Sequence, residues 1–155
     1  MLSDYLASQL EKVYQAEPWY GPGLLESLNK LPEMQWQAKL GHRTVAGLVG
    51  HIIAWRKFVV GRLADGTEFD IEMNTRSDWP DCSEISRADL LTQLAESQTS
   101  LLTALAGLTD EQLAIKVPAK YEFSKGDLAL GIMQHDVYHV GQINLLVSLL
   151  SERET

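Results

Sequence analysis

Histidine is the residue type in this chain whose spacing most clearly suggests chemistry. Two of the four histidines, His135 and His139, are four residues apart. In a helix this spacing places both rings on one face, one turn from each other. Two neutral imidazoles on adjacent turns can point at one transition-metal ion. The spacing therefore indicates a metal site on this helix.

The two histidines belong to a helical stripe whose positions alternate in steps of four and three. The stripe is Leu128, Ile132, His135, His139, Gln142, Leu146 and Leu149. Each histidine could instead simply hydrogen-bond across a helical core, because an unpaired buried polar group costs about 1–3 kcal/mol. Because two histidines lie together in the middle of an apolar stripe, the metal site is favoured over separate hydrogen bonds across the core. Gln142 is expected to line its pocket or to orient a histidine by a hydrogen bond.

The third histidine of interest, His51, belongs to a second stripe with the same period. The members of this stripe are Thr44, Leu48, His51, Trp55, Phe58 and Arg62. If the two helices are neighbours, the three rings can converge in one layer of the core. Three neutral imidazoles with an open coordination position are typical of a catalytic metal site rather than a closed structural one. Trp55 is expected either to pack in the core or to line the pocket.

Other chemically interesting side chains fit such a site less well. Asp136 is next to His135 but points about 100° away around the helix, so it is not expected to be a ligand. Tyr138 could donate a hydrogen bond to a substrate, but it lies off the stripe and is predicted instead to be a packing residue. His42 precedes a helix start and is predicted to be exposed, and Cys82 has no neighbouring base in the sequence. No catalytic residue is assigned.

The periodicity predicts an all-α chain with four main helices. They cover residues 4–31, 44–64, 86–107 and 125–151, the first interrupted at Pro18. Thr44 is a favourable N-cap, and Ser86 and Ser124 each precede an acidic residue by three positions, a pattern typical of helix starts. No segment alternates with period two for long, so a sheet is not expected.

The connection over residues 65–85 is long for a compact domain. A crossover of this length allows the second and third helices to run parallel. The connection is therefore expected to be either functional or a crossover along a helical bundle. Trp79 and Pro80, which lie within the crossover, are predicted to anchor it on the bundle.

Length and composition predict one domain over residues 1–155. The chain has 13 basic and 21 acidic residues and a net charge of −8, which argues against nucleic-acid binding. The start of the chain does not read as a signal peptide, and the apolar runs are too short to span a bilayer. A single cysteine, Cys82, excludes an intramolecular disulfide and fits a reducing compartment. A cytoplasmic protein is expected.

Two stretches of sequence surround the three histidines. Residues 48–56 read LVGHIIAWR and residues 135–143 read HDVYHVGQI. Together these motifs resemble the DinB/YfiT-like family of metalloenzymes. Trp19-Tyr20-Gly21 and Trp79-Pro80 are also similar to features of that family, and the resemblance covers essentially the whole chain.

The resemblance implies an all-α four-helix bundle with up-down-down-up order and a long crossover between helices two and three. It also implies that His51, His135 and His139 hold one divalent ion, nickel or zinc. Its members include a mycothiol-dependent maleylpyruvate isomerase and bacillithiol S-transferases, and many are dimers. For this chain it implies a metal-dependent transferase that acts with a low-molecular-weight thiol on a small-molecule substrate. A homodimer is also implied.

Two alternative functions would use the same residues. One is a metal-dependent hydrolase in which the ion activates water. The other is a non-catalytic helical bundle that stores or senses metal, or that only dimerises. Metal content and turnover distinguish the last from the two enzymes, and a requirement for thiol distinguishes the transferase from the hydrolase.

Overall fold

The computed structural model describes residues 1–39, 41–118 and 122–152. Within them the chain is helical, as predicted, apart from loops and isolated bridges such as the antiparallel one between Lys116 and Ser124. The helices are α1 (Leu2–Tyr14), α2 (Leu24–Asn29), the 3-10 helix η1 (Glu33–Gln35), α3 (Val45–Leu63), α4 (Arg87–Leu105), α5 (Asp110–Leu113) and α6 (Lys125–Glu152).

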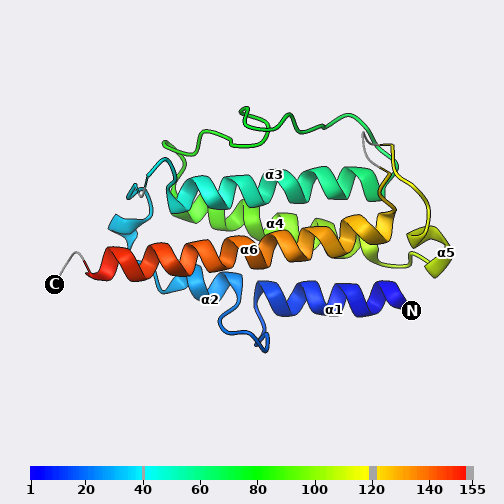
Figure 1. Cartoon of the computed structure of the whole chain (residues 1–155), viewed down its shortest axis with the longest axis horizontal. Helices are drawn as coiled ribbons and strands as arrows, with labels where there is room; N and C mark the ends of the chain where they lie inside the picture. Colours follow the sequence, from blue (N-terminus) through cyan, green and yellow to red (C-terminus); the bar gives the residue numbers. More distant parts are fainter. Residues whose placement is uncertain (40, 119–121, 153–155) are drawn as a thin grey trace.

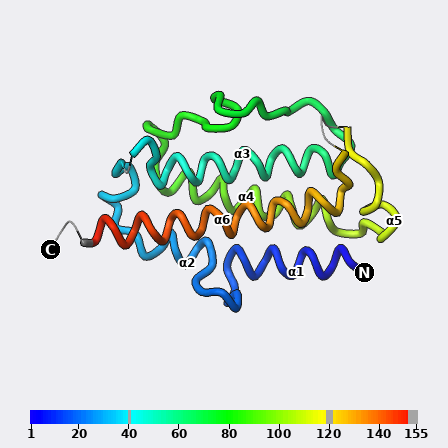
Figure 2. The backbone as a smooth tube through the Cα atoms, viewed as in Figure 1, coloured from blue at the N-terminus to red at the C-terminus, as the bar shows by residue number. Residues whose placement is uncertain are grey.

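The long helices lie side by side (Figures 1 and 2). α6 extends along most of the molecule, and α1 and α2 follow one another beside it. α3 and α4 begin at the same end of the molecule and run in the same direction, whereas α6 runs in the opposite direction. The chain between α3 and α4 returns along the length of α3 (Figure 1). It therefore covers one side of the helix that carries His51.

The predicted interruption of the first helix is present as a loop between α1 and α2. Pro18 and Pro22 lie in this loop, and neither can continue a helical hydrogen-bond ladder. Gly21 has a φ of 136°, a backbone conformation that glycine adopts without steric cost. The chain therefore forms two consecutive short helices instead of one long one.

The predicted helix starts are capped by the expected side chains. The Thr44 hydroxyl accepts a hydrogen bond from the Gly47 amide at 2.9 Å. Ser86 and Ser124 accept equivalent bonds at the starts of α4 and α6, both at 3.1 Å. These bonds satisfy amides that have no partner within the helix. They fix where α3, α4 and α6 begin.

Two apolar clusters fill the core and meet at a polar layer. The first contains Leu24, Leu28, Leu48, Ile52, Leu90, Leu94, Val140 and Ile143. The second contains Leu6, Leu10, Val59, Leu63, Leu101, Leu105, Ala129 and Ile132. On α6, His135 and His139 lie between the two clusters, and on α3, His51 lies at the end of the first cluster, beside Ile52. The apolar packing on either side therefore sets the height of the histidines in the bundle.

A buried ion pair crosses the same layer. Arg56 of α3 donates two hydrogen bonds to one carboxylate oxygen of Asp136 on α6, at 2.7 and 3.1 Å. Both side chains are fully buried. Arg56 also bonds Ser97 of α4 at 3.2 Å, and its guanidinium lies 5.4 Å from the centre of the Tyr14 ring of α1. One side chain therefore connects four helices, and sequence analysis did not anticipate it.

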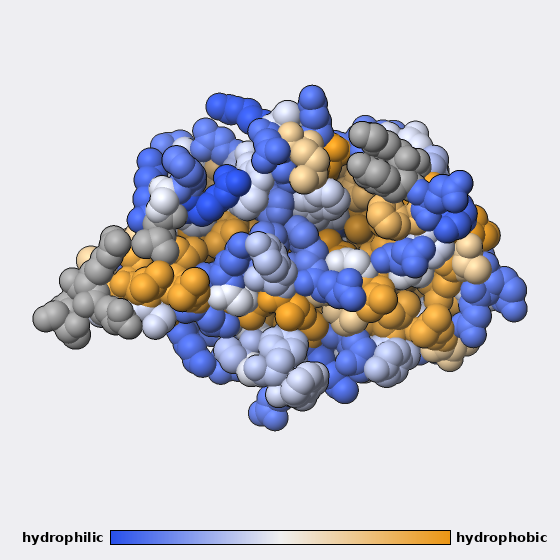
Figure 3. All heavy atoms as spheres, in the orientation of Figure 1, coloured by the Kyte–Doolittle hydropathy of each residue, from blue (hydrophilic) through white to orange (hydrophobic). Residues whose placement is uncertain are grey.

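The surface seen in Figure 3 is largely hydrophilic, which agrees with the high content of acidic residues. Apolar residues interrupt it near the C-terminal part of α6, where Leu145 is 60% exposed. Among the described helices, none combines the length and the apolar character that crossing a membrane requires.

Removing the charge of Asp136 tests the role of the buried pair. Asp136→Asn leaves the Arg56 guanidinium buried without its counter-ion, which is expected to lower the free energy of unfolding by about 3 kcal/mol or more. Glu26→Gln is the matched control, because it makes the same change in the exposed Lys30–Glu26 pair and is expected to cost less than about 1 kcal/mol. Urea denaturation measures both values, and equal costs would contradict this role.

Candidate metal centre

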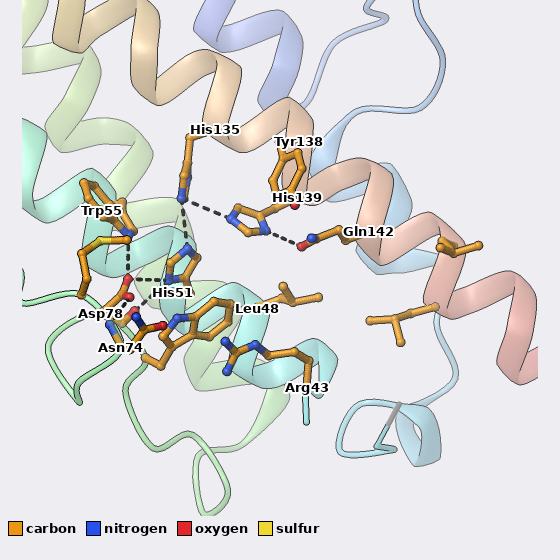
Figure 4. A pocket seen from close by; sticks show the side chains of 14 residues that line it. Arg43, Leu48, His51, Trp55, Asn74, Asp78, His135, Tyr138, His139 and Gln142 are labelled. Carbon is orange, nitrogen blue, oxygen red and sulfur yellow. Dashed lines mark hydrogen bonds and ion pairs between the residues drawn. The ribbon is translucent and has the colours of Figure 1, made fainter. Parts of the chain in front are cut away.

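The three histidines on the two predicted stripes converge in the structure. His51 comes from α3, and His135 and His139 come from α6 (Figure 4). The Nε2 atom of His135 lies 3.1 Å from Nε2 of His51 and 3.2 Å from Nε2 of His139. Each ring offers one nitrogen to a group in which these atoms lie within 4.8 Å of one another. The expectation that the three rings meet in one layer is confirmed.

The outer nitrogens of two rings are held by oxygen acceptors. Nδ1 of His51 donates to the backbone carbonyl of Asp78 at 2.8 Å and lies 3.1 Å from its carboxylate. Nδ1 of His139 donates to Oε1 of Gln142 at 2.6 Å. Both Nδ1 atoms therefore carry the ring proton, and both Nε2 atoms present a lone pair to the centre of the group.

This tautomer assignment makes the group fit a metal ion. His135 can donate at most one proton from its Nε2, so it cannot satisfy the lone pairs of both His51 and His139. A cation between the rings would satisfy all three nitrogens at once. A tetrahedral ion about 2.0–2.1 Å from each nitrogen requires nitrogen separations of about 3.3–3.4 Å, close to the two separations observed. The residues present therefore suit a divalent transition metal.

The outer nitrogen of His135 differs from the other two. Nδ1 of His135 and Oδ1 of Asp136 are both buried, and neither has a hydrogen-bond partner in the part of the chain that the structure describes. They lie 4.0 Å apart. Asp136 therefore directs one oxygen to Arg56 and leaves the other near His135, although its side chain leaves the helix away from the histidine face, as expected.

Burial shifts the protonation of two histidines toward the neutral form that binds metals. Burial and, to a lesser extent, the neighbouring His135 lower the pKa of His139 to about 4, although the hydrogen bond to Gln142 opposes this shift. Burial also lowers the pKa of His51, although its bond to the Asp78 carbonyl opposes this shift. Both rings are therefore neutral at pH 7 and available as ligands.

The histidines open onto a cavity of about 560 Å³. Trp55 and Gln142, the two residues expected to line a pocket, are both part of its wall. Trp55 also donates a hydrogen bond to the Asp78 carboxylate at 2.9 Å. The crossover supplies the opposite wall, including Trp79, which stacks on the His51 ring at 3.8 Å with an interplanar angle of 9°. The cavity therefore gives a small molecule access to the histidines.

Three further residues can be compared with their predicted roles. His42 is exposed, and neither His42 nor Cys82 lines the cavity or belongs to the histidine group. Burial raises the pKa of the Cys82 thiol, which keeps it in its thiol form at pH 7. The expectation that Tyr138 is a packing residue is wrong. Its side chain is 64% exposed, lines the cavity and meets the His139 ring edge-on at 5.1 Å. Tyr138 is next to His139 in the sequence and lies at the exposed rim of the cavity.

Sequence reasoning missed the residues of the crossover and the helix start that complete the site. Asp78 bonds His51, Trp55 and the Asn74 amide, and Arg43 lines the cavity from just before α3. Asp78 directly precedes Trp79, which was predicted to anchor the crossover on the bundle. This position next to an anchor was the feature of the sequence that could have indicated its role. Asp78 lies 27 residues from His51 in the sequence. Helical periodicity therefore cannot show that it is the hydrogen-bond partner of this histidine.

Acidification of the metal-free protein is expected to destabilise it. Since the pKa of His139 is lower in the folded chain than the ordinary value of about 6.5, the unfolded chain takes up the proton first as the pH falls. Stability should therefore be complete above about pH 6.5 and decline toward pH 4. The melting temperature at pH 7 and pH 5 measures this loss, which His139→Gln should reduce. An NMR titration midpoint for the His139 ring near 6.5 would contradict it.

Comparison with known families supports the resemblance carried by the histidine motifs. A model of the DinB superfamily matches residues 22–143, a span that contains all three converging histidines. Among curated proteins, no match to the chain was found. The family match extends over more than half of the sequence and agrees with the helical fold. The chain belongs to the DinB superfamily.

Proposed function

We propose that the chain is a metal-dependent enzyme whose ion is held by His51, His135 and His139. The observation that carries this proposal is the convergence of three Nε2 atoms in the wall of an open cavity. Nε2 of His135 lies 3.1 Å from Nε2 of His51 and 3.2 Å from Nε2 of His139. A purely structural histidine cluster would be expected to pair its lone pairs with donors. Here the two fixed tautomers direct lone pairs toward each other.

The surrounding residues prepare the site for a ligand. Asp78 and Gln142 hold the Nδ1 protons of His51 and His139, so both rings keep their orientation and their free Nε2 lone pairs. Trp79 covers one face of His51 and Trp55 fixes the Asp78 carboxylate. A divalent ion held there supplies a positive charge that lowers the pKa of a thiol or water bound beside it.

Transfer to or from a low-molecular-weight thiol is the proposed reaction class. Three neutral imidazoles leave the full charge of a divalent ion uncompensated, which favours an anionic ligand such as a thiolate. The resemblance to thiol-dependent relatives points to the same chemistry. Nickel and zinc are the proposed metals, because both accept imidazole ligands. We also propose the up-down-down-up bundle order, supported by the directions of α3, α4 and α6 in Figure 1.

Removing one ligand tests the metal site. His135→Ala is expected to abolish stoichiometric binding of one divalent ion, because only two of the three imidazole ligands remain. His42→Ala is the control, since His42 is exposed and lies outside the histidine group, and it is expected to leave binding intact. Elemental analysis of protein purified without a metal-affinity tag measures the occupancy. Full occupancy in both variants would refute the three-histidine site.

Titrating the cobalt-substituted protein with small thiols tests the reaction class. A thiol that binds next to the cobalt ion is expected to produce a thiolate-to-metal charge-transfer band. Addition of an electrophile should then consume the thiol. If no thiol changes the spectrum and the protein instead cleaves esters or amides with water, the hydrolase replaces the transferase. If metal binds without any turnover, the site has a storage or sensing function.

A further inference from the structure

Arg43 is a cation in the cavity wall that no role assigned so far uses. It lies two residues before α3 and lines the same cavity as the three histidines. Figure 4 shows its side chain extending from the start of α3 toward the histidine group. The residue is exposed, so its guanidinium remains accessible to a molecule in the cavity.

The Arg43 guanidinium is held in place by stacking. Its central carbon lies 3.4 Å from the centre of the Trp79 ring. Trp79 in turn stacks on His51 at 3.8 Å. Two groups this close to one ring must occupy its opposite faces, so Trp79 lies between them. The stack positions the Arg43 charge at a fixed place relative to the histidines, which reduces the entropy that a ligand would have to pay to order it.

The charge of Arg43 has no carboxylate partner among the residues that the structure describes. No hydrogen bond or ion pair of that part of the chain involves its guanidinium, and the acidic side chain of the cavity wall, Asp78, is fully engaged with other groups. One Asp78 oxygen accepts from Trp55 and lies 3.1 Å from His51, and the other accepts from the Asn74 amide. All five guanidinium N–H groups of Arg43 therefore remain available to a ligand.

We propose that Arg43 binds a carboxylate of the small molecule on which this site acts. A planar guanidinium offers two parallel N–H donors that match the two oxygens of a carboxylate. A guanidinium that stacks face to face on an indole, as a distance of 3.4 Å from its central carbon to the ring centre favours, keeps the donors at its edges free for a ligand. The substrate class is therefore a small carboxylate that reaches from Arg43 toward the histidines. This inference deepens the proposed function and relies on the same cavity.

The first test uses metal-free protein, so that an ion cannot bind the carboxylate in place of Arg43. Propionate and the neutral propionamide are titrated while the indole N–H signal of Trp79, identified with Trp79→Phe, is followed by NMR. Propionate is expected to shift this signal and propionamide is not. Arg43→Gln should weaken the propionate response about tenfold, the loss expected for a charged hydrogen-bonded pair. Arg43→Lys should give an intermediate loss, because it keeps the charge without the paired donors.

Arg76→Gln is the matched control, because Arg76 is an exposed arginine of the crossover that does not line the cavity. It should leave the propionate response unchanged. The melting temperatures of all variants are compared with that of the original chain to confirm folding. Equal responses to propionate and propionamide, or a response that survives Arg43→Gln, would overturn the proposal.

A second titration on cobalt-substituted protein locates the carboxylate on one of the two reactants. 3-Mercaptopropionate is compared with 3-mercaptopropionamide. A preference of about tenfold for the acid that is lost in Arg43→Gln supports the proposal and places the carboxylate on the thiol. Equal affinities, together with a positive result in the metal-free protein, support it with the carboxylate on the electrophile. If no thiol perturbs the cobalt spectrum, the thiol reaction fails while the metal-free result still decides the role of Arg43.

Discussion

Three imidazole nitrogens converge in this structure, and the two that belong to His51 and His139 direct lone pairs toward the third. Such an arrangement is unfavourable for the polypeptide alone, because one ring cannot donate to both of the others. It becomes favourable when a cation lies between the rings. Asp78 and Gln142 enforce the arrangement by accepting the outer protons of His51 and His139. The crossover and α6 therefore fix the tautomers that suit the three histidines to a metal ion.

The scaffold keeps the histidine layer at a fixed height. Apolar clusters pack above and below it, and the buried Arg56–Asp136 pair connects α3 to α6 within it. A buried ion pair of this kind adds little net stability compared with apolar packing, but removing only one of its two charged partners is costly, because the other charge stays buried without compensation. Here it can specify the register of two helices whose relative shift would separate His51 from His135. This role links a stability feature to the geometry of the site.

Much of this structure follows from sequence periodicity. The helical stripes place His51, His135 and His139 on inward faces, and hydroxyl caps such as Thr44 define the helix starts. Periodicity describes one helix at a time, so it could not show that Asp78 crosses from the long connection to bond His51. It also could not show that Arg56 and Asp136, which lie off the histidine stripes, pair in the core. Loop conformation and burial decide both, and they depend on the whole fold.

X-ray absorption spectroscopy of the zinc-loaded protein tests the central claim most directly, because it reports the atoms bound to the ion without requiring a known reaction. One zinc ion per chain is expected, with three imidazole nitrogens at about 2.0–2.1 Å, and His139→Ala is expected to lose the ion as His135→Ala does. A first shell that contains the sulfur of Cys82, or that lacks imidazole scattering, would contradict the three-histidine site.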